Sequence, residues 1–117
     1  MTSINQNFTM YSGDDKTIIV TINNNDNQAV NLSGLLAAQF VAKKYAKSST
    51  VDITKTLGGG ITITDASNGK ISIVLDSADT ASLDPGEYYT ETRIQDSSSR
   101  TGTVSVGIMT LKQADSL

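Results

Sequence analysis

The stretch Leu83-Asp84-Pro85-Gly86-Glu87-Tyr88 decides the fold of this chain. Proline followed by glycine forces a turn, and Tyr88 stands two residues after the glycine, where a strand begins. This arrangement is typical of a tyrosine corner, in which a tyrosine hydroxyl donates a hydrogen bond to the backbone just upstream and fixes a Greek-key crossover. The simpler alternative is a turn followed by an ordinary core tyrosine. Either way, Leu83, Pro85, Gly86 and Tyr88 are structural residues.

Apolar residues alternate with polar ones on both sides of this corner, as they do in half-buried strands. The alternating segments are residues 17–22, 60–64, 70–75, 88–94 and 103–108. In the fourth, Tyr88, Thr90, Thr92 and Ile94 are predicted to face inward. Asn68-Gly69 predicts a tight hairpin between the second and third, because glycine accommodates positive φ. Residues 4–11 and 51–55 are further candidate strands.

Two places in this pattern are ambiguous. Residues 35–45 are rich in helix-forming residues, yet Leu36 and Phe40 also fit an alternating strand, and the flanking segments are strands. We expect a strand here, with Leu36 and Phe40 facing the core. In the last strand Leu111 falls out of phase with Ile108, and a bulge near Gly107 would account for the slip.

The length indicates one domain over residues 1–117, and seven or eight short strands at this spacing indicate an all-β sandwich. The chain has no cysteine, so no disulfide supports the core. Its net charge of −3 includes no basic stripe, which argues against binding to nucleic acid. The sequence shows neither a secretory signal nor an apolar segment approaching about 20 residues, so we expect no membrane contact and folding in a cytoplasm.

Residue types needed for most catalysis are missing. Without histidine and cysteine there is no ordinary general base near neutral pH, no thiol nucleophile and no zinc site. We therefore expect a protein that is not an enzyme and that needs no cofactor. Asp14-Asp15 and the pair Asp76 and Asp79 are the best candidates for calcium, but no EF-hand loop is present. A turn and a helix cap explain these aspartates more simply, and we predict no metal site.

Candidate interface residues come from two sources. Tyr89 is expected to point away from Tyr88, either as an interface residue or as a lone surface aromatic residue. The two terminal segments carry little charge to protect a sheet edge, so one of them is expected to pair with a neighbouring subunit or to lie across a particle surface. From the first of them we name Ile4, Phe8 and Met10 as candidate interface residues.

With these motifs in place, the chain resembles the small immunoglobulin-like virion proteins of tailed bacteriophages. It is similar in particular to the amino-terminal domain of baseplate upper proteins and to head decoration or cement proteins. The spacing between the strand at Gly69-Lys70-Ile71 and the corner at Tyr88 is the most specific part of the match. The other matching segments are Gly13-Asp14-Asp15-Lys16-Thr17, Ala29-Val30-Asn31-Leu32-Ser33-Gly34, Phe40-Val41-Ala42-Lys43, Val51-Asp52-Ile53-Thr54-Lys55, Gly60-Ile61-Thr62-Ile63, Asp79-Thr80 and Gly107.

The resemblance implies an immunoglobulin-like Greek-key sandwich that serves as a virion structural protein, either a capsid decoration or a baseplate or tail subunit. Its partners would be its own copies, as a dimer or trimer, and capsid or tail proteins of the same particle. Baseplate proteins carry further domains after this one, whereas this sequence ends at Leu117, which favours a free-standing subunit. The alternative is a carbohydrate- or receptor-binding adhesin module, although aromatic residues make up only 5% of the chain and tryptophan is absent.

Overall fold

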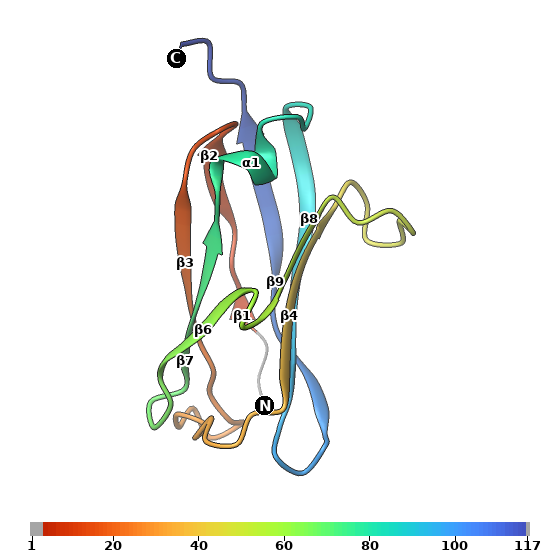
Figure 1. The fold of residues 1–117 in the computed structure, drawn as a ribbon. Coiled ribbons are helices and arrows are strands. Elements are labelled where there is room, and N and C mark those ends of the chain that lie inside the picture. Colours follow the sequence, from red (N-terminus) through yellow and green to blue (C-terminus); the bar gives the residue numbers. More distant parts are fainter. Residues whose placement is uncertain (1–3, 117) are drawn as a thin grey trace.

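The computed structural model describes residues 4–116, and in this part of the chain nine strands and one short helix form an elongated body (Figure 1). The elements are β1 (Ile4–Asn5), β2 (Phe8–Tyr11), β3 (Lys16–Thr21), β4 (Ala37–Lys43), β5 (Ile53–Leu57), β6 (Gly60–Asp65), β7 (Lys70–Leu75), α1 (Ser77–Thr80), β8 (Gly86–Gln95) and β9 (Thr101–Lys112). The all-β prediction is confirmed. No helix in the described residues has the length and apolar character needed to cross a membrane.

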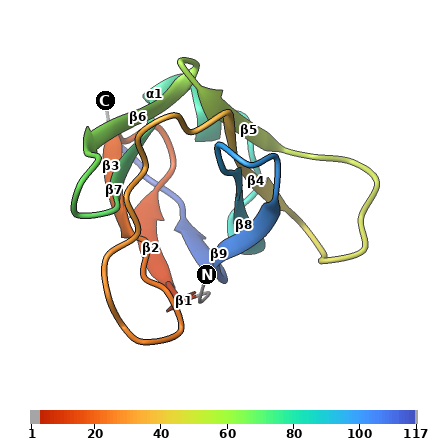
Figure 2. The same ribbon diagram turned by 90° about the horizontal axis from the view of Figure 1, so that it is seen from below.

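The strands form one curled sheet in the order β1-β9-β8-β4-β5-β6-β7-β3, and β2 also pairs with β9. The curl produces two layers, one of β1/β2, β9, β8 and β4 and the other of β6, β7 and β3, which face each other across the core (Figure 2). β5 joins the layers through a short parallel contact with β6, in which Thr56 pairs with Gly60 and Leu57 with Ile61. The chain crosses between layers from β3 to β4 and from β7 to β8, as in a Greek-key sandwich.

The sequence predicted seven or eight strands, and residues 4–116 contain nine. The number is higher because the first predicted strand, residues 4–11, is divided into β1 and β2. β1 and β2 both run parallel to β9, with Ile4 opposite Ser105 and Phe8 opposite Met109. Between them the Gln6 N–H donates to the Val106 carbonyl at 2.7 Å. The two pieces therefore form one broken edge strand along β9.

The alternation predicted from sequence builds the core. Tyr88, Thr90, Thr92 and Ile94 of β8 all point inward and are at most 4% exposed. The antiparallel hairpin of β6 and β7 is present, and Gly69 in its turn has a φ of +68°. This glycine packs against the backbone of Ile22 and Val30, so a side chain there would meet main-chain atoms as well as an unfavourable dihedral angle.

The ambiguous segment at residues 35–45 is a strand. β4 pairs antiparallel with both β5 and β8, and Phe40 is 3% exposed, as expected for a core residue. Leu36 does not follow the prediction, since it is 54% exposed. It lies before the first residue of β4, where its N–H still bonds to the Gln95 carbonyl, so the strand's alternation does not extend back to it.

The predicted bulge near Gly107 is wrong in position. The register between β8 and β9 shifts between Thr92 and Arg93, which face Ser105 and Thr103, and Val104 is the extra residue. Val104 and Ser105 are consecutive and both buried, which is the result of a bulge. Beyond it Gly107, Met109 and Leu111 point inward, while Ile108 points outward.

The interruption of the edge strand between β1 and β2 requires a glycine at position 107. A Cβ atom there would collide with the carbonyl oxygen of Gln6 and would lie 2.6 Å from its carbonyl carbon. Next to this crossing, the Ile108 N–H donates to the Asn7 Oδ1 at 2.9 Å. The terminal segments thus pair with each other, and β1 and β2 form one end of the sheet.

The corner at the start of β8 has the geometry that a tyrosine corner requires. The Tyr88 hydroxyl donates to the Asp84 carbonyl at 2.6 Å, and the residue is 2% exposed. Burial raises the pKa of this hydroxyl, so it remains a donor. Leu83 packs against the core, and Gly86 has a φ of +145°. The corner fixes the inward and outward phase of β8 and therefore the position of Tyr89.

Replacing Gly107 by alanine should lower the free energy of unfolding by about 1–3 kcal/mol, because the backbone of Gln6 must move to admit a methyl group. Chemical denaturation measures the change. Thr101→Ala, at an exposed position of the same strand, is the control and should stay within about 0.5 kcal/mol of wild type. Equal stability of Gly107→Ala and Thr101→Ala would contradict the close crossing.

Replacing Tyr88 by phenylalanine should cost about 1 kcal/mol of stability, because it removes only the hydroxyl that bonds to Asp84. Thermal unfolding measures this loss. Tyr89→Phe is the matched control and should cost less, since Tyr89 is only partly buried whereas Tyr88 is fully buried. A wild-type melting temperature for Tyr88→Phe would show that the corner bond contributes no stability.

Candidate interaction surface

Tyr89 lies on the outer face of the layer formed by β4, β8 and β9, as predicted. Its neighbours across the strands are Lys43 on β4 and Ile108 on β9. The Tyr89 hydroxyl donates to the Glu91 Oε2 at 2.9 Å. Partial burial and this bond to a carboxylate raise the pKa of Tyr89, which keeps its ring neutral and its hydroxyl protonated.

Tyr89 forms part of a shallow depression of about 520 Å³ on this face. We call it the Tyr89 surface. It is lined by Lys44, Tyr45, Ala46, Glu87, Tyr89 and Ile108. Tyr45 is 71% exposed and Ile108 is 36% exposed. The lining combines two tyrosines and an isoleucine with one acidic and one basic side chain, a mixture that suits contact with another protein.

Tyr45 reaches this surface from a projecting segment. Residues 44–52 connect β4 to β5 and extend away from the body in both views (Figures 1 and 2). The Ser48 N–H bonds to the Tyr45 carbonyl at 3.0 Å, which turns the chain back. Lys44 holds its ammonium group 5.6 Å from the centre of the Tyr88 ring, a cation–π distance. The segment also exposes Lys47, so it is basic as well as aromatic.

The candidate interface residues at the N-terminus are turned toward the core. Met10 is 4% exposed, and Ile4 and Phe8 are partly buried against core residues. The parallel pairing with β9 sets this orientation, because it places Met10 opposite Leu111, whose side chain is also buried. Met10 is therefore a core residue and not an interface residue, and Ile4 and Phe8 offer little free surface.

Sequence reasoning did not name Tyr45 or Ile108 as interface residues. Tyr45 lies in the segment whose structure was ambiguous, next to Lys43 and Lys44, and a lone aromatic residue among lysines was the available signal. The outward position of Ile108 depends on the bulge at Val104, which cannot be located from the alternation. Ile108 joins Tyr89 only through the pairing of β8 with β9, and Tyr45 joins it from the connection between β4 and β5.

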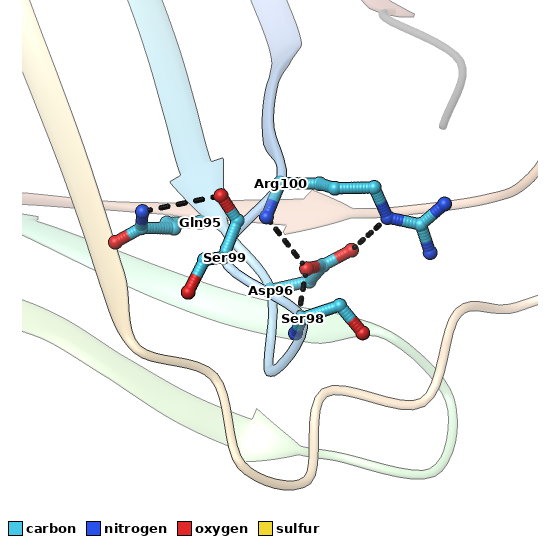
Figure 3. Close-up of polar contacts among 5 residues, drawn as sticks. All are labelled: Gln95, Asp96, Ser98, Ser99 and Arg100. Atoms are coloured by element: carbon cyan, nitrogen blue, oxygen red, sulfur yellow. Dashed lines mark hydrogen bonds and ion pairs between the residues drawn. The ribbon is translucent and has the colours of Figure 1, made fainter.

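The loop between β8 and β9, at the opposite end of the same layer, is ordered by one carboxylate (Figure 3). Asp96 accepts bonds from the N–H groups of Ser98 and Arg100 at 2.9 and 3.0 Å, and its other oxygen lies 3.5 Å from the Arg100 Nε. The Gln95 side chain donates to the Ser99 carbonyl at 3.3 Å, and Ser99 has a φ of +64°. The loop is therefore held in one conformation by its own polar groups.

Two of the four aspartates considered for calcium accept hydrogen bonds from backbone N–H groups. Asp15 accepts from the Ser77 N–H at 2.8 Å, and Asp79 accepts from the Asp76 N–H at 2.7 Å. Asp79 also forms an ion pair of 2.8 Å with Lys55. Within residues 4–116 no group of three carboxylates is placed to hold a metal ion. These contacts tie the turn before β3 and helix α1 together at one end of the sandwich.

Comparison with known proteins shows that this chain shares its fold with solved structures. No protein-family model matches the sequence, and no curated protein matches it. Among solved structures, the N-terminal domain of phage TP901-1 ORF48 has 20% identity and a TM-score of 0.56, with 95% of this chain and 91% of that chain covered. CopC from Methylosinus trichosporium OB3b has 11% identity and a TM-score of 0.51, with 95% and 88% covered.

The Asp96 carboxyl should titrate below the usual value for aspartate, chiefly because the Arg100 N–H bonds to it and lowers its pKa. The pKa is lower in the folded chain than in the unfolded one. The stability that the ionised Asp96 adds to the folded state is therefore fully present above about pH 4 and is lost as the pH falls through the folded pKa. An NMR titration of the Asp96 carboxyl measures this pKa. In Asp96→Ala the amides of Ser98 and Arg100 should exchange faster, and a normal midpoint in wild type would contradict the network.

Proposed function

We propose that this chain is a non-enzymatic structural protein of a tailed bacteriophage particle. The observation that carries the proposal is the fold shared with the N-terminal domain of phage TP901-1 ORF48 over 95% of this chain. The sequence resemblance to immunoglobulin-like virion proteins supports it independently, since it rests on local motifs such as the Tyr88 corner. Within a particle the chain acts as a capsid decoration or cement protein or as a baseplate or tail subunit.

The Tyr89 surface is the part of the molecule that we assign to contact with capsid or tail proteins. Tyrosine rings supply a large contact area at low cost in conformational entropy and are enriched at binding hot spots. The Tyr89 ring is held in place by its bond to Glu91 and by its strand neighbours Lys43 and Ile108. An anchor fixed before binding loses little freedom on association.

The chemistry of the chain is consistent with this role. Without histidine or cysteine its surface offers no ordinary acid–base or thiol chemistry, so its contribution is contact and stability. A core that needs no disulfide can fold in the reducing cytoplasm of the host before the subunit joins the particle. The partners we propose are its own copies and the capsid or tail proteins of one particle.

Attachment to particles assembled without this protein tests the proposal. Purified chain added to such particles should co-sediment with them and saturate at a fixed number of copies. Tyr89→Lys and Ile108→Lys should each weaken attachment at least about tenfold, which corresponds to about 1.4 kcal/mol. Val74→Lys is the matched control, since Val74 is 37% exposed but lies on the opposite layer.

Two results would count against the role. Failure of the wild-type chain to attach to the deficient particles would overturn it. Tight binding to a glycan array or to a cell-surface protein, with no attachment to particles, would replace it with the adhesin function. Loss of attachment in Val74→Lys with retention in Tyr89→Lys would instead show that the wrong surface has been assigned.

A further inference from the structure

The edge of the sheet at β3 is open. β3 is the last strand in the sheet order, and within residues 4–116 its one strand partner is β7. Its register with β7 is regular over six consecutive pairs, so no bulge blunts it. The residues after Lys16 are Thr17-Ile18-Ile19-Val20-Thr21-Ile22, without charge or proline. Natural sheet edges usually carry such protection, and an edge without it is suited to pairing with another strand.

The backbone groups at this edge can be assigned to individual residues. In an antiparallel pair, alternate residues direct both their N–H and C=O toward the partner strand, and the residues between them direct both away. The Ile22 N–H bonds to the carbonyl of Gly69, the residue directly before β7, so Ile22 faces the partner strand. The Ile19 carbonyl accepts from the Gln6 side chain at 3.0 Å, on the side of β3 that faces away from β7. Thr17, Ile19 and Thr21 therefore present their backbone groups outward.

We propose that two copies of this chain dimerise by antiparallel pairing of their β3 strands about a two-fold axis at Ile19. Ile19 then faces Ile19 of the second copy, and Thr17 faces Thr21. These are the residues whose backbone groups point outward, so the register gives about six hydrogen bonds between the copies. Threonine pairs and pairs of β-branched residues are favourable across strands. The segment is thus complementary to itself, as an isologous interface requires.

The charges at the ends of the segment also fit this register. No charged side chain lies between Thr17 and Thr21, so the paired strands do not repel each other. If the same register continues beyond the ends of β3, the exposed Asp14-Asp15 turn of one copy lies near Asn23 and Asn24 of the other. Carboxylates then face amide groups, which can donate hydrogen bonds to them.

The other end of the sheet is less suited to such pairing. There the edge strand is broken between β1 and β2 at Gln6 and Asn7, and the Asn7 side chain is bonded to β9. In the monomer the Gln6 side chain donates one hydrogen bond to the Ile19 carbonyl at the centre of the β3 edge, and this contact is exposed. A carbonyl oxygen accepts two hydrogen bonds, so a second copy can add its own bond to this oxygen. Because the dimer uses both β3 edges, it closes and does not grow.

Cysteine cross-linking tests the register directly, since the natural chain has no cysteine. Directly opposed residues in hydrogen-bonded antiparallel pairs have Cα atoms about 5.5 Å apart, within disulfide range. Ile19→Cys should therefore form a covalent dimer under mild oxidation. Thr17→Cys and Thr21→Cys should each fail alone and should cross-link when the two variants are mixed. Ile108→Cys, also partly exposed but on the other layer, is the control and should remain monomeric.

Sedimentation velocity over a concentration series gives the second readout. Wild type and Ile108→Lys should shift from monomer to dimer, and Ile19→Lys should stay monomeric while its circular dichroism remains that of a sheet protein. A wild-type monomer at every concentration, or Ile19→Cys cross-linking no faster than Ile108→Cys, would overturn the proposal. This inference does not depend on the particle role: a dimer that fails to attach to particles overturns that role alone, and a monomer that attaches overturns the dimer alone.

Discussion

The close crossing of Gln6 over Gly107 is the constraint on which the arrangement of the edges depends. It is possible only because Gly107 has no side chain, and it lets the N-terminal strand continue along β9 from β1 to β2. This pairing covers the edge of β9 and turns Met10 into the core. One segment can add to only one layer, so the same choice leaves β3 without a second partner.

Local patterns in the sequence predicted much of the fold, because they depend on neighbouring residues. The phase of β8 follows from the Tyr88 corner and an unbroken alternation, and the hairpin before Lys70 follows from Asn68-Gly69. The failures at Leu36 and near Gly107 share a cause. A strand's first residue and its bulges are set by pairing with distant strands, and a shift of one residue reverses which side chains face the core.

The candidate surface was predictable only in part, for the same reason. Tyr89 is outward because it follows an inward Tyr88, a relation that the sequence contains. Ile108 meets it only because β8 and β9 pair in one register after the bulge, and Tyr45 arrives on a loop whose path no local pattern specifies. Charge was a poor guide to the edges, since the weakly charged N-terminal strand covers β9 and is broken at Gln6 and Asn7, whereas the uncharged β3 is unbroken.

The two proposed surfaces lie on opposite layers, and this placement connects them. Pairing of two β3 strands joins the β6-β7-β3 layers into one continuous sheet, with the two-fold axis perpendicular to it. Such an axis keeps the second layers of both copies on the same side of that sheet, so both Tyr89 surfaces face in the same direction. A dimer can then bind two neighbouring sites on a repetitive surface. The second contact is intramolecular, which multiplies weak individual affinities. Self-association through β3 thus strengthens attachment through Tyr89 without any contact between the two surfaces.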